Sequence, residues 1–206
     1  MPIRVLIADD HNMVRMGLRE MLSLSPDVTV VAEACDGKEA VALFREHRPD
    51  VAILDIRMPE ATGVQAIEAI RAEFPNARLI AMSNYEGDED IYRAIRAGAK
   101  AYLFKSVGGE DLLATLTAVH EGRQWLAPDV ASRLAERVGA PSLTPRELDV
   151  LKEMARGSGN SAIATALGIS HETVKVHVKR ILDKLGADTR SQAISTALQK
   201  GIVHLD

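Results

Sequence analysis

The sequence has little of what marks several large classes of protein. It holds one cysteine, Cys35, among 206 residues, so no disulfide within the chain can staple the fold and a reducing compartment is expected. No apolar run near the start has the form of a secretion signal, and none elsewhere is long enough to cross a bilayer. No internal repeat or low-complexity tract occurs. These absences favour a globular protein of the cytoplasm.

The charges are divided unevenly along the chain. Residues 1–141 hold 16 Lys and Arg against 22 Asp and Glu, a net of −6, whereas residues 142–206 hold 9 against 7, a net of +2. A change of sign between the two parts suggests two modules with different partners. An excess of two positive charges is by itself weak support for a nucleic-acid partner.

Residues 1–120 alternate between two hydrophobic periods. Short runs rich in Val, Ile and Leu predict strands, and the segments between them have helical spacing. Nearly continuous apolar strands are typical of a parallel sheet covered on both faces. The pattern therefore predicts an α/β domain with a doubly wound, five-stranded parallel sheet. Strands are expected at residues 3–8, 28–34, 51–55, 78–83 and 101–105, and helices at 12–24, 37–48, 63–74, 87–98 and 108–120.

Polar side chains stand where four of these strands end. Asp9 and Asp10 follow the first strand, Asp55 ends the third, Ser83 ends the fourth and Lys105 ends the fifth. The carboxyl ends of parallel strands meet at one rim of a sheet, which is where ligands bind in such folds. The five side chains are therefore expected to converge.

The chemistry of this set suits phosphoryl transfer. Three neighbouring carboxylates repel one another, and Mg²⁺ would relieve the repulsion because it prefers oxygen ligands and needs only one or two protein carboxylates. Lys105 adds a positive charge and Ser83 a hydroxyl. A phosphoryl group arriving on Asp55 would then find a partner for each of its oxygens.

Each of these residues has a simpler explanation when taken alone. An Asp-Asp pair after a strand is often only a helix N-cap, and Asp55 could merely solvate the end of its strand. Lys105 would be a solvated lysine and Ser83 an ordinary turn residue. Matching placement at four strand ends is improbable by chance, so the combination favours a phosphoacceptor site.

Residues 1–120 resemble the receiver domain of bacterial two-component response regulators. The matching motifs are IADDH (7–11), LDIRMPEATG (54–63), Ser83 and the lysine that closes AYLFK (101–105). The resemblance implies that a sensor histidine kinase phosphorylates Asp55, and that Arg57 and Tyr85 lie where receivers tune the lifetime of the phosphoaspartate. The implied Mg²⁺ ligands are Asp10, Asp55 and the backbone carbonyl of Arg57, with Asp9 acting through water, and the implied switch residues are Ser83, Tyr102 and Lys105.

The remainder of the chain reads differently. Residues 121–142 predict a linker with a short helix, ASRLAERV, and from residue 143 onward only helical patterns occur. Capping boxes begin at Thr144 and Thr189, Ser170 is a further N-cap, and glycines end two helices. Helix, glycine turn and helix together predict a small all-α helix-turn-helix domain over residues 143–206. Its helices are expected at residues 145–156, 161–167, 171–185 and 190–200.

The third of these helices has two contrasting faces. Its apolar face should pack on the first two helices. On the opposite face, solvation explains the charged residues but not Val176, since an apolar side chain gains nothing in water. In a DNA major groove Val176 could touch a thymine methyl while Lys175 and Lys179 reach guanine edges or phosphates. The apolar face holds Val174, Val178, Ile181, Leu182 and Leu185, and the opposite face Glu172, Lys175, Val176, Lys179 and Asp183.

Residues 143–205 resemble the LuxR-type helix-turn-helix of the NarL/FixJ group of regulators. The matches are LTPRE (143–147), ALGIS (166–170), ETVKVHVKRILDKLG (172–186) and TRSQA (189–193). The resemblance implies that residues 171–185 form the recognition helix. Lys175, Val176 and Lys179 would face bases, and Thr173, His177 and Arg180 would contact phosphates.

The two resemblances together imply a response regulator transcription factor and not an enzyme. It would bind double-stranded promoter DNA, as a homodimer when phosphorylated, with RNA polymerase as a further candidate partner. Two alternatives stay open. A phosphatase of the haloacid dehalogenase type also uses a strand-end aspartate, but it needs an acid two residues later, where this chain has Arg57. A phosphorylation-switched adaptor would use its C-terminal helices, Val176 included, to bind protein instead of DNA.

Overall fold

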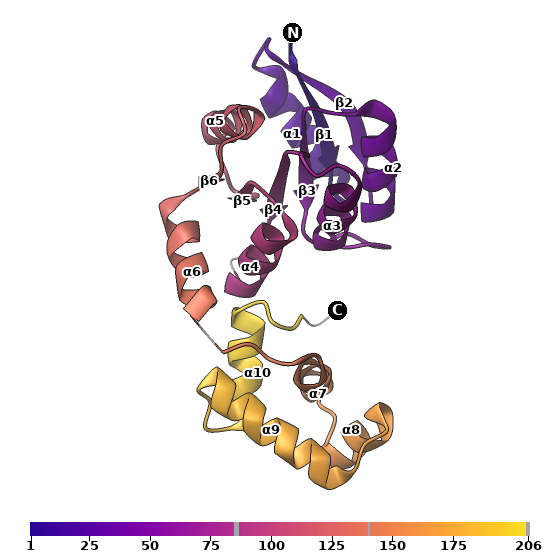
Figure 1. Cartoon of the computed structure of the whole chain (residues 1–206), viewed down its shortest axis with the longest axis vertical. Helices are drawn as coiled ribbons and strands as arrows, with labels where there is room; N and C mark the ends of the chain where they lie inside the picture. The colour runs from indigo at the N-terminus through magenta and orange to yellow at the C-terminus, as the bar shows by residue number, and fades with distance from the viewer. Residues whose placement is uncertain (85–86, 140, 205–206) are drawn as a thin grey trace. The chain divides into compact units, whose positions relative to one another are not determined.

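The computed structural model describes residues 1–84, 87–139 and 141–204 (Figure 1). The chain forms two compact units, one made of residues 1–86 and 91–134 and the other of residues 87–90 and 135–206. Within the described residues, no helix is both long and apolar enough to cross a membrane.

The first unit is built on a parallel sheet with strand order β2-β1-β3-β4-β5-β6. The predicted α/β class and doubly wound topology are confirmed, since the order reverses direction at β1 and helices cover both faces (Figure 1). The strands are β1 (Ile3–Ala8), β2 (Val28–Ala34), β3 (Val51–Asp55), β4 (Leu79–Ser83), β5 (Ala101–Phe104) and β6 (Trp125–Leu126), and the helices are α1 (Asn12–Ser23), α2 (Gly37–His47), α3 (Gly63–Glu73), α4 (Asp88–Ala97), α5 (Gly109–His120) and α6 (Pro128–Gly139).

The prediction of five strands was wrong by one. Trp125 and Leu126, which the sequence placed in the linker, pair in parallel with Ala101 and Tyr102 of β5. The backbone N–H of Trp125 also donates to the Lys100 carbonyl at 2.9 Å. A two-residue strand is too short to show a hydrophobic period, so the pattern could not reveal it.

Alternate residues of each strand enter two separate cores. Val5 and Ile7 of β1 join the cluster that α1 and α5 cover, whereas Leu6 and Ala8 join the cluster under α2, α3 and α4. Figure 1 shows this division, with α1 and α5 on one side of the sheet and α2 and α3 on the other. Val130 of α6 is also buried in the second of these clusters, so the core of this unit extends beyond residue 120.

The loop from β3 to α3 is held very close to the end of β3. Thr62 caps α3 through a capping box with Gln65, and the backbone N–H of Gly63 donates to the Ile56 carbonyl at 2.9 Å. A Cβ atom added at Gly63 would stand 1.9 Å from the carbonyl oxygen of Asp55. Only glycine therefore allows α3 to begin this near to Asp55.

The second unit is all helical, as predicted. Its helices are α7 (Pro145–Ala155), α8 (Asn160–Leu167), α9 (His171–Leu185) and α10 (Arg190–Gln199). They enclose one core whose buried members include Val150, Ile163, Val174 and Ile181. Gly168 and Gly186 end α8 and α9 in the left-handed conformation, which glycine adopts at little cost.

The caps of these helices follow the prediction with one exception. The capping box of Thr144 and Glu147 is complete, and the Ser170 side chain accepts from the backbone N–H of Thr173. Thr189 accepts from Gln192 as expected, but the Gln192 side chain accepts from the backbone N–H of Asp188 instead of Thr189. The second predicted box is therefore only half formed, because the glutamine reaches one residue further back.

Replacing Gly63 with alanine is expected to destabilise the first unit by about 1–3 kcal/mol, the usual cost of forcing an extra methyl group into a packed site. Urea unfolding followed by fluorescence would measure this change, since the lone tryptophan, Trp125, lies in the sheet of this unit. Gly17→Ala is the matched control, because a Cβ atom at this helical position meets nothing within 4 Å. It should stabilise by up to about 1 kcal/mol. Equal stability for Gly63→Ala and the wild type would contradict the close approach.

Candidate functional site

The strand-end residues that the sequence singled out lie at one rim of the sheet. Asp9 follows β1 and is 1% exposed, Asp55 ends β3 and is 3% exposed, and Ser83 ends β4 and is fully buried. Asp10 is exposed beside Asp9. Because parallel strands run in the same direction, their carboxyl ends bring these side chains together.

Lys105 joins the buried acids. Its ammonium nitrogen lies 2.6 Å from Asp9 Oδ2 and 2.9 Å from Asp55 Oδ2, and the Lys105 side chain is only 7% exposed. The backbone N–H of Lys105 donates to the Ser83 carbonyl at 2.9 Å, which ties the end of β5 to the end of β4. A lysine whose side chain is solvated would not form these two ion pairs, so the simpler explanation of Lys105 fails.

Burial and charge act against each other here. Burial raises the pKa of Asp55 to about 6, although the hydrogen bond from Lys105 and its positive charge both act to lower that pKa, and the backbone N–H of Arg57 also donates to the carboxylate. Burial acts to lower the pKa of Lys105, but its hydrogen bonds to Asp9 and Asp55 outweigh this and raise it. The lysine therefore stays charged beside two carboxylates.

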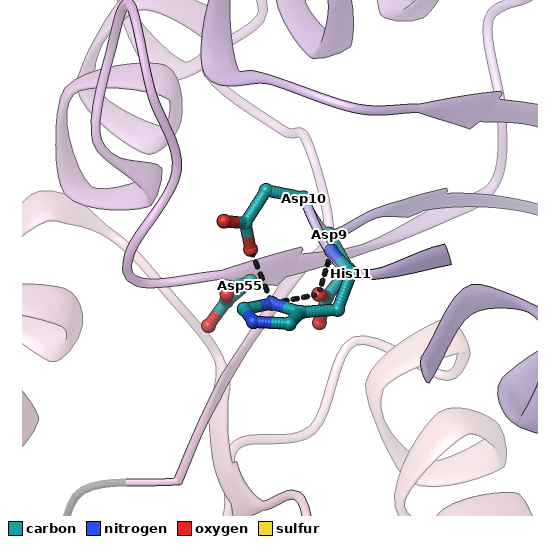
Figure 2. Close-up of side chains that lie close together, drawn as sticks. All are labelled: Asp9, Asp10, His11 and Asp55. Atoms are coloured by element: carbon teal, nitrogen blue, oxygen red, sulfur yellow. Dashed lines mark hydrogen bonds and ion pairs between the residues drawn. The ribbon is translucent and has the colours of Figure 1, made fainter. Parts of the chain in front are cut away.

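The acidic side chains fit a divalent cation. Asp9, Asp10, His11 and Asp55 each offer a ligand atom, and these atoms lie within 4.8 Å of one another (Figure 2). Lys105 supplies one positive charge against three carboxylates, so a dication would complete the neutralisation. The carboxylate oxygens are the donors that Mg²⁺ and Ca²⁺ prefer.

His11 is a neighbour that sequence reasoning did not assign. Its Nδ1 lies 2.6 Å from Asp10 Oδ1, and its backbone N–H donates to Asp9 Oδ1 at 2.9 Å (Figure 2). The imidazole is 66% exposed. The signals in the sequence were its position directly after the two aspartates and its place in the matching motif IADDH.

The predicted switch residues lie on adjacent strands. Ser83 of β4 pairs in register with Phe104 of β5, two residues after Tyr102. Tyr102 is 1% exposed, and its ring packs edge-on against Phe104 with the centroids 5.8 Å apart. The aromatic side chain of Tyr102 therefore lies inside the fold. Tyr85 lies outside the described residues.

The faces of α9 divide as their spacing predicted. Val174 and Ile181 are buried, and Val178, Leu182 and Leu185 pack against the same core. On the other side, Val176 is 49% exposed among charged neighbours. A surface hollow of about 420 Å³ is lined by Glu172, Lys175, Val176, Lys179, Arg180 and Asp183.

The three residues predicted to contact phosphates differ in how exposed they are. Thr173 is exposed, and its hydroxyl oxygen lies 2.8 Å from that of the Ser170 cap. His177 is only partly exposed, and its Nδ1 is buried with no hydrogen-bond partner among the described residues. Arg180 is exposed on the edge of the hollow. Of these three residues, Arg180 is the one that is both exposed and beside the hollow.

Contacts of three basic side chains hold α9 and its neighbours in place. The Lys184 ammonium lies 2.7 Å from Glu147 Oε2, and Glu147 is 2% exposed, so α9 is fastened to the first turn of α7. Arg190 donates to the Ser158 carbonyl at 2.6 Å and to Asn160 at 3.2 Å, which ties α10 to the start of α8. The guanidinium of Arg146 donates to the Leu167 carbonyl at the end of α8. These contacts and the apolar core therefore fix the position of α9 relative to α7, α8 and α10.

Comparison with known protein families also divides the chain into two domains. The family described as the response regulator receiver domain matches residues 5–117, and the family described as bacterial regulatory proteins of the luxR type matches residues 141–197. The chain is 38% identical over 211 residues to the transcriptional regulatory protein YdfI of Bacillus subtilis (strain 168), covering 98% of this chain and 99% of YdfI.

Solved structures agree over the whole length. The response regulator ChrA of a heme-sensing two-component system is 38% identical, with a TM-score of 0.59 over 98% of this chain and 99% of ChrA. A structure of two RcsB dimers bound to two parallel DNAs gives 25% identity and a TM-score of 0.70 over 97% of this chain and 99% of RcsB. The chain thus belongs to the response regulators that combine a receiver domain with a LuxR-type DNA-binding domain. These are transcription regulators and not enzymes.

Asp55→Asn should stabilise the metal-free protein, and more so at pH 7.5 than at pH 4. The folded protein holds a proton on Asp55 more tightly than the unfolded chain, because the pKa rises from 3.8 to about 6. The contribution of Asp55 to the free energy of unfolding is therefore fully present below about pH 4 and is lost as the pH rises through 6. The full difference is at most about 3 kcal/mol. Urea unfolding of both proteins in a chelator would measure it, and a gap that is equal at the two pH values would contradict the buried, raised acid.

Proposed function

We propose that Asp55 is the phosphoacceptor of this response regulator and that a sensor histidine kinase supplies the phosphoryl group. The observation that carries this proposal is the bridge from the Lys105 ammonium to Asp9 and Asp55, at 2.6 and 2.9 Å, between three side chains that are nearly buried. It presents a carboxylate beside a fixed positive charge, at the point where negative charge accumulates during phosphoryl transfer.

The transfer follows from this geometry. A carboxylate oxygen of Asp55 attacks the phosphorus of a phosphohistidine, an O–P bond forms as the N–P bond breaks, and the imidazole leaves and takes a proton from solvent. Lys105 keeps its proton throughout and stabilises the added negative charge. The backbone N–H of Arg57, which donates to Asp55, helps to orient the carboxylate.

We propose Mg²⁺ as the cation of the acidic cluster. Asp10, Asp55 and the Arg57 carbonyl would hold it, with Asp9 acting through water. When bound, the ion neutralises the negative charges of the carboxylates and of the phosphoryl oxygens. Ser83 and Tyr102 are the proposed switch: the Ser83 hydroxyl would bond a phosphoryl oxygen, and the Tyr102 ring would be turned inward, where it is buried in this structure.

The second unit is proposed to bind promoter DNA through α9. Lys175, Val176 and Lys179 would face bases, and Thr173, His177 and Arg180 would contact phosphates. The exposed Val176 among cations supports a major-groove surface, where an apolar side chain can meet a thymine methyl. RcsB, which aligns over nearly the whole chain, is bound to DNA as dimers. A homodimer on two half-sites is proposed here as well, with phosphorylation favouring the paired form.

The proposed domains are a receiver at residues 1–120, a linker at 121–142 and the helix-turn-helix domain at 143–206. A promoter target would place the protein in the bacterial cytoplasm, with RNA polymerase as a candidate partner at the promoter.

The decisive experiment selects genomic DNA fragments with the purified protein, with and without a small phosphodonor and Mg²⁺. The wild type should gain affinity for a two-fold symmetric site by about 5–150-fold, the usual range of coupling between two sites. Asp55→Ala should show no gain, and removing Mg²⁺ with a chelator should abolish the gain of the wild type. An equal gain in Asp55→Ala would exclude Asp55 as the switch. No enrichment in any sample would favour a protein partner over DNA.

Arg180→Ala should weaken DNA binding about equally on all sequences and reduce the slope of log affinity against log salt concentration by about 1. The reason is that a phosphate contact releases roughly one counterion and carries no base information. Lys152→Ala removes the same charge from an exposed position on α7 and should leave the slope unchanged. Fluorescence anisotropy titrations at several salt concentrations would measure both slopes. An unchanged slope for Arg180→Ala would remove this residue from the interface.

A further inference from the structure

The DNA-facing surface of α9 carries a negative charge that phosphate binding does not explain. Glu172 lines the same hollow as Lys175, Val176 and Lys179, and its side chain is 77% exposed. A carboxylate near a polyanionic duplex is repelled, so it lowers affinity unless it meets a hydrogen-bond donor. Glu172 therefore needs an explanation that the phosphate contacts do not give.

The position of Glu172 places it at the end of α9 that reads DNA in helix-turn-helix proteins. The helix begins after the Ser170 cap, so Glu172 lies in its first turn. N-terminal residues of a recognition helix are the ones that contact base edges. Glu172 is also three and four residues before Lys175 and Val176, and these spacings put all three side chains on one face.

The charge state of Glu172 limits what it can bind. The Lys175 ammonium donates to Glu172 Oε1 at 2.8 Å, and this hydrogen bond, together with the charge of Lys175, lowers the pKa of Glu172. The side chain is therefore an ionised carboxylate at neutral pH, which accepts hydrogen bonds and donates none. The Lys175 ammonium at 2.8 Å and His171 Nδ1 at 3.8 Å both lie against Oε1, so Oε2 is the oxygen that a ligand can approach.

We propose that Glu172 is a specificity-determining residue that selects cytosine at one position in each half-site, an inference that rests on the proposed DNA-binding function of α9. In the major groove, guanine presents the acceptors N7 and O6, thymine presents the acceptor O4, and adenine presents an acceptor beside its amino group. Cytosine alone offers an amino donor with no acceptor beside it. An ionised carboxylate is attracted to that edge and repelled by the other three.

The neighbouring residues extend the same argument. Lys175 would lie beside the carboxylate on the same face, and its ammonium can donate to the guanine of an adjacent base pair while it stays bonded to Glu172. Val176, one residue further, suits a thymine methyl. The expected half-site therefore holds a cytosine next to a position where guanine is preferred.

A purely structural role is the competing explanation. A carboxylate in the first turn of a helix stabilises the helix through its dipole, and the pair with Lys175 could simply add to this. Such a role would change binding to all sequences alike, whereas base reading changes the preference at one position. The two explanations therefore differ in the pattern of base preference and not in overall affinity.

The test is selection of binding sites from a randomised DNA library by the full-length wild type, Glu172→Ala, Glu172→Gln and Asp183→Asn, each treated with phosphodonor and Mg²⁺. In Glu172→Ala, the preference for cytosine at one position of each half-site should fall by roughly tenfold, with the other positions retained. In Glu172→Gln, the same position should change to adenine, because an amide can donate to N7 and accept from N6. Asp183→Asn is the matched control, since it removes an acidic charge from the same face about 16 Å further along the helix, and its site should be unchanged.

Lys175→Ala separates direct reading from an effect transmitted through the lysine. The cytosine preference should survive this substitution, while a neighbouring position loses its preference. Loss of the cytosine preference in Lys175→Ala would overturn the direct role of Glu172, as would an identical selected site for the wild type and Glu172→Ala. If the wild type selects no DNA at all, the proposed function fails and this inference fails with it, whereas a wild-type site without cytosine overturns the inference alone.

Discussion

The bridge from one lysine to two buried carboxylates is the contact on which the receiver unit depends. Lys105 follows β5, Asp9 follows β1 and Asp55 ends β3, so the bridge joins β5 to two strands that are not its neighbours in the sheet. Without the lysine, two carboxylates would be buried with little to balance their charge, which is costly in a medium of low polarity. With this bridge in place, the pKa of Asp55 is about 6. Any group that supplies further positive charge or hydrogen bonds to the carboxylate would lower this pKa.

The helix-turn-helix unit uses the same physical device for another purpose. Glu147 is buried at the first turn of α7, and Lys184 reaches it from the last turn of α9. Desolvation acts to raise the pKa of Glu147, but the hydrogen bonds from Lys184 and from the Thr144 backbone outweigh it and hold the carboxylate ionised. This pair fixes α9, whose opposite face is the proposed DNA-binding surface, so an ion pair holds the helix in place in addition to its apolar packing.

The residues at the rim of the sheet could be predicted from the sequence because the carboxyl ends of parallel strands always lie at the same edge of a sheet. Once Asp9, Asp55 and Lys105 were assigned to strand ends, their convergence followed from topology. The two faces of α9 followed from helical periodicity for the same reason. His11 could not be assigned in this way, because its contact with Asp10 depends on the angle at which α1 leaves β1. The strand at Trp125 was missed because two residues carry no period.

The short β6 has a consequence for how copies of the chain can meet. An exposed strand edge presents unpaired backbone groups and invites pairing with a strand of another molecule, which leads to aggregation. In this sheet, β6 contains only Trp125 and Leu126 and pairs with Ala101 and Tyr102, the first half of β5. The row of free backbone groups on that side is therefore very short. Association through this edge is therefore disfavoured, and the longer edge strand of the sheet is β2, which has seven residues and lies at the opposite edge.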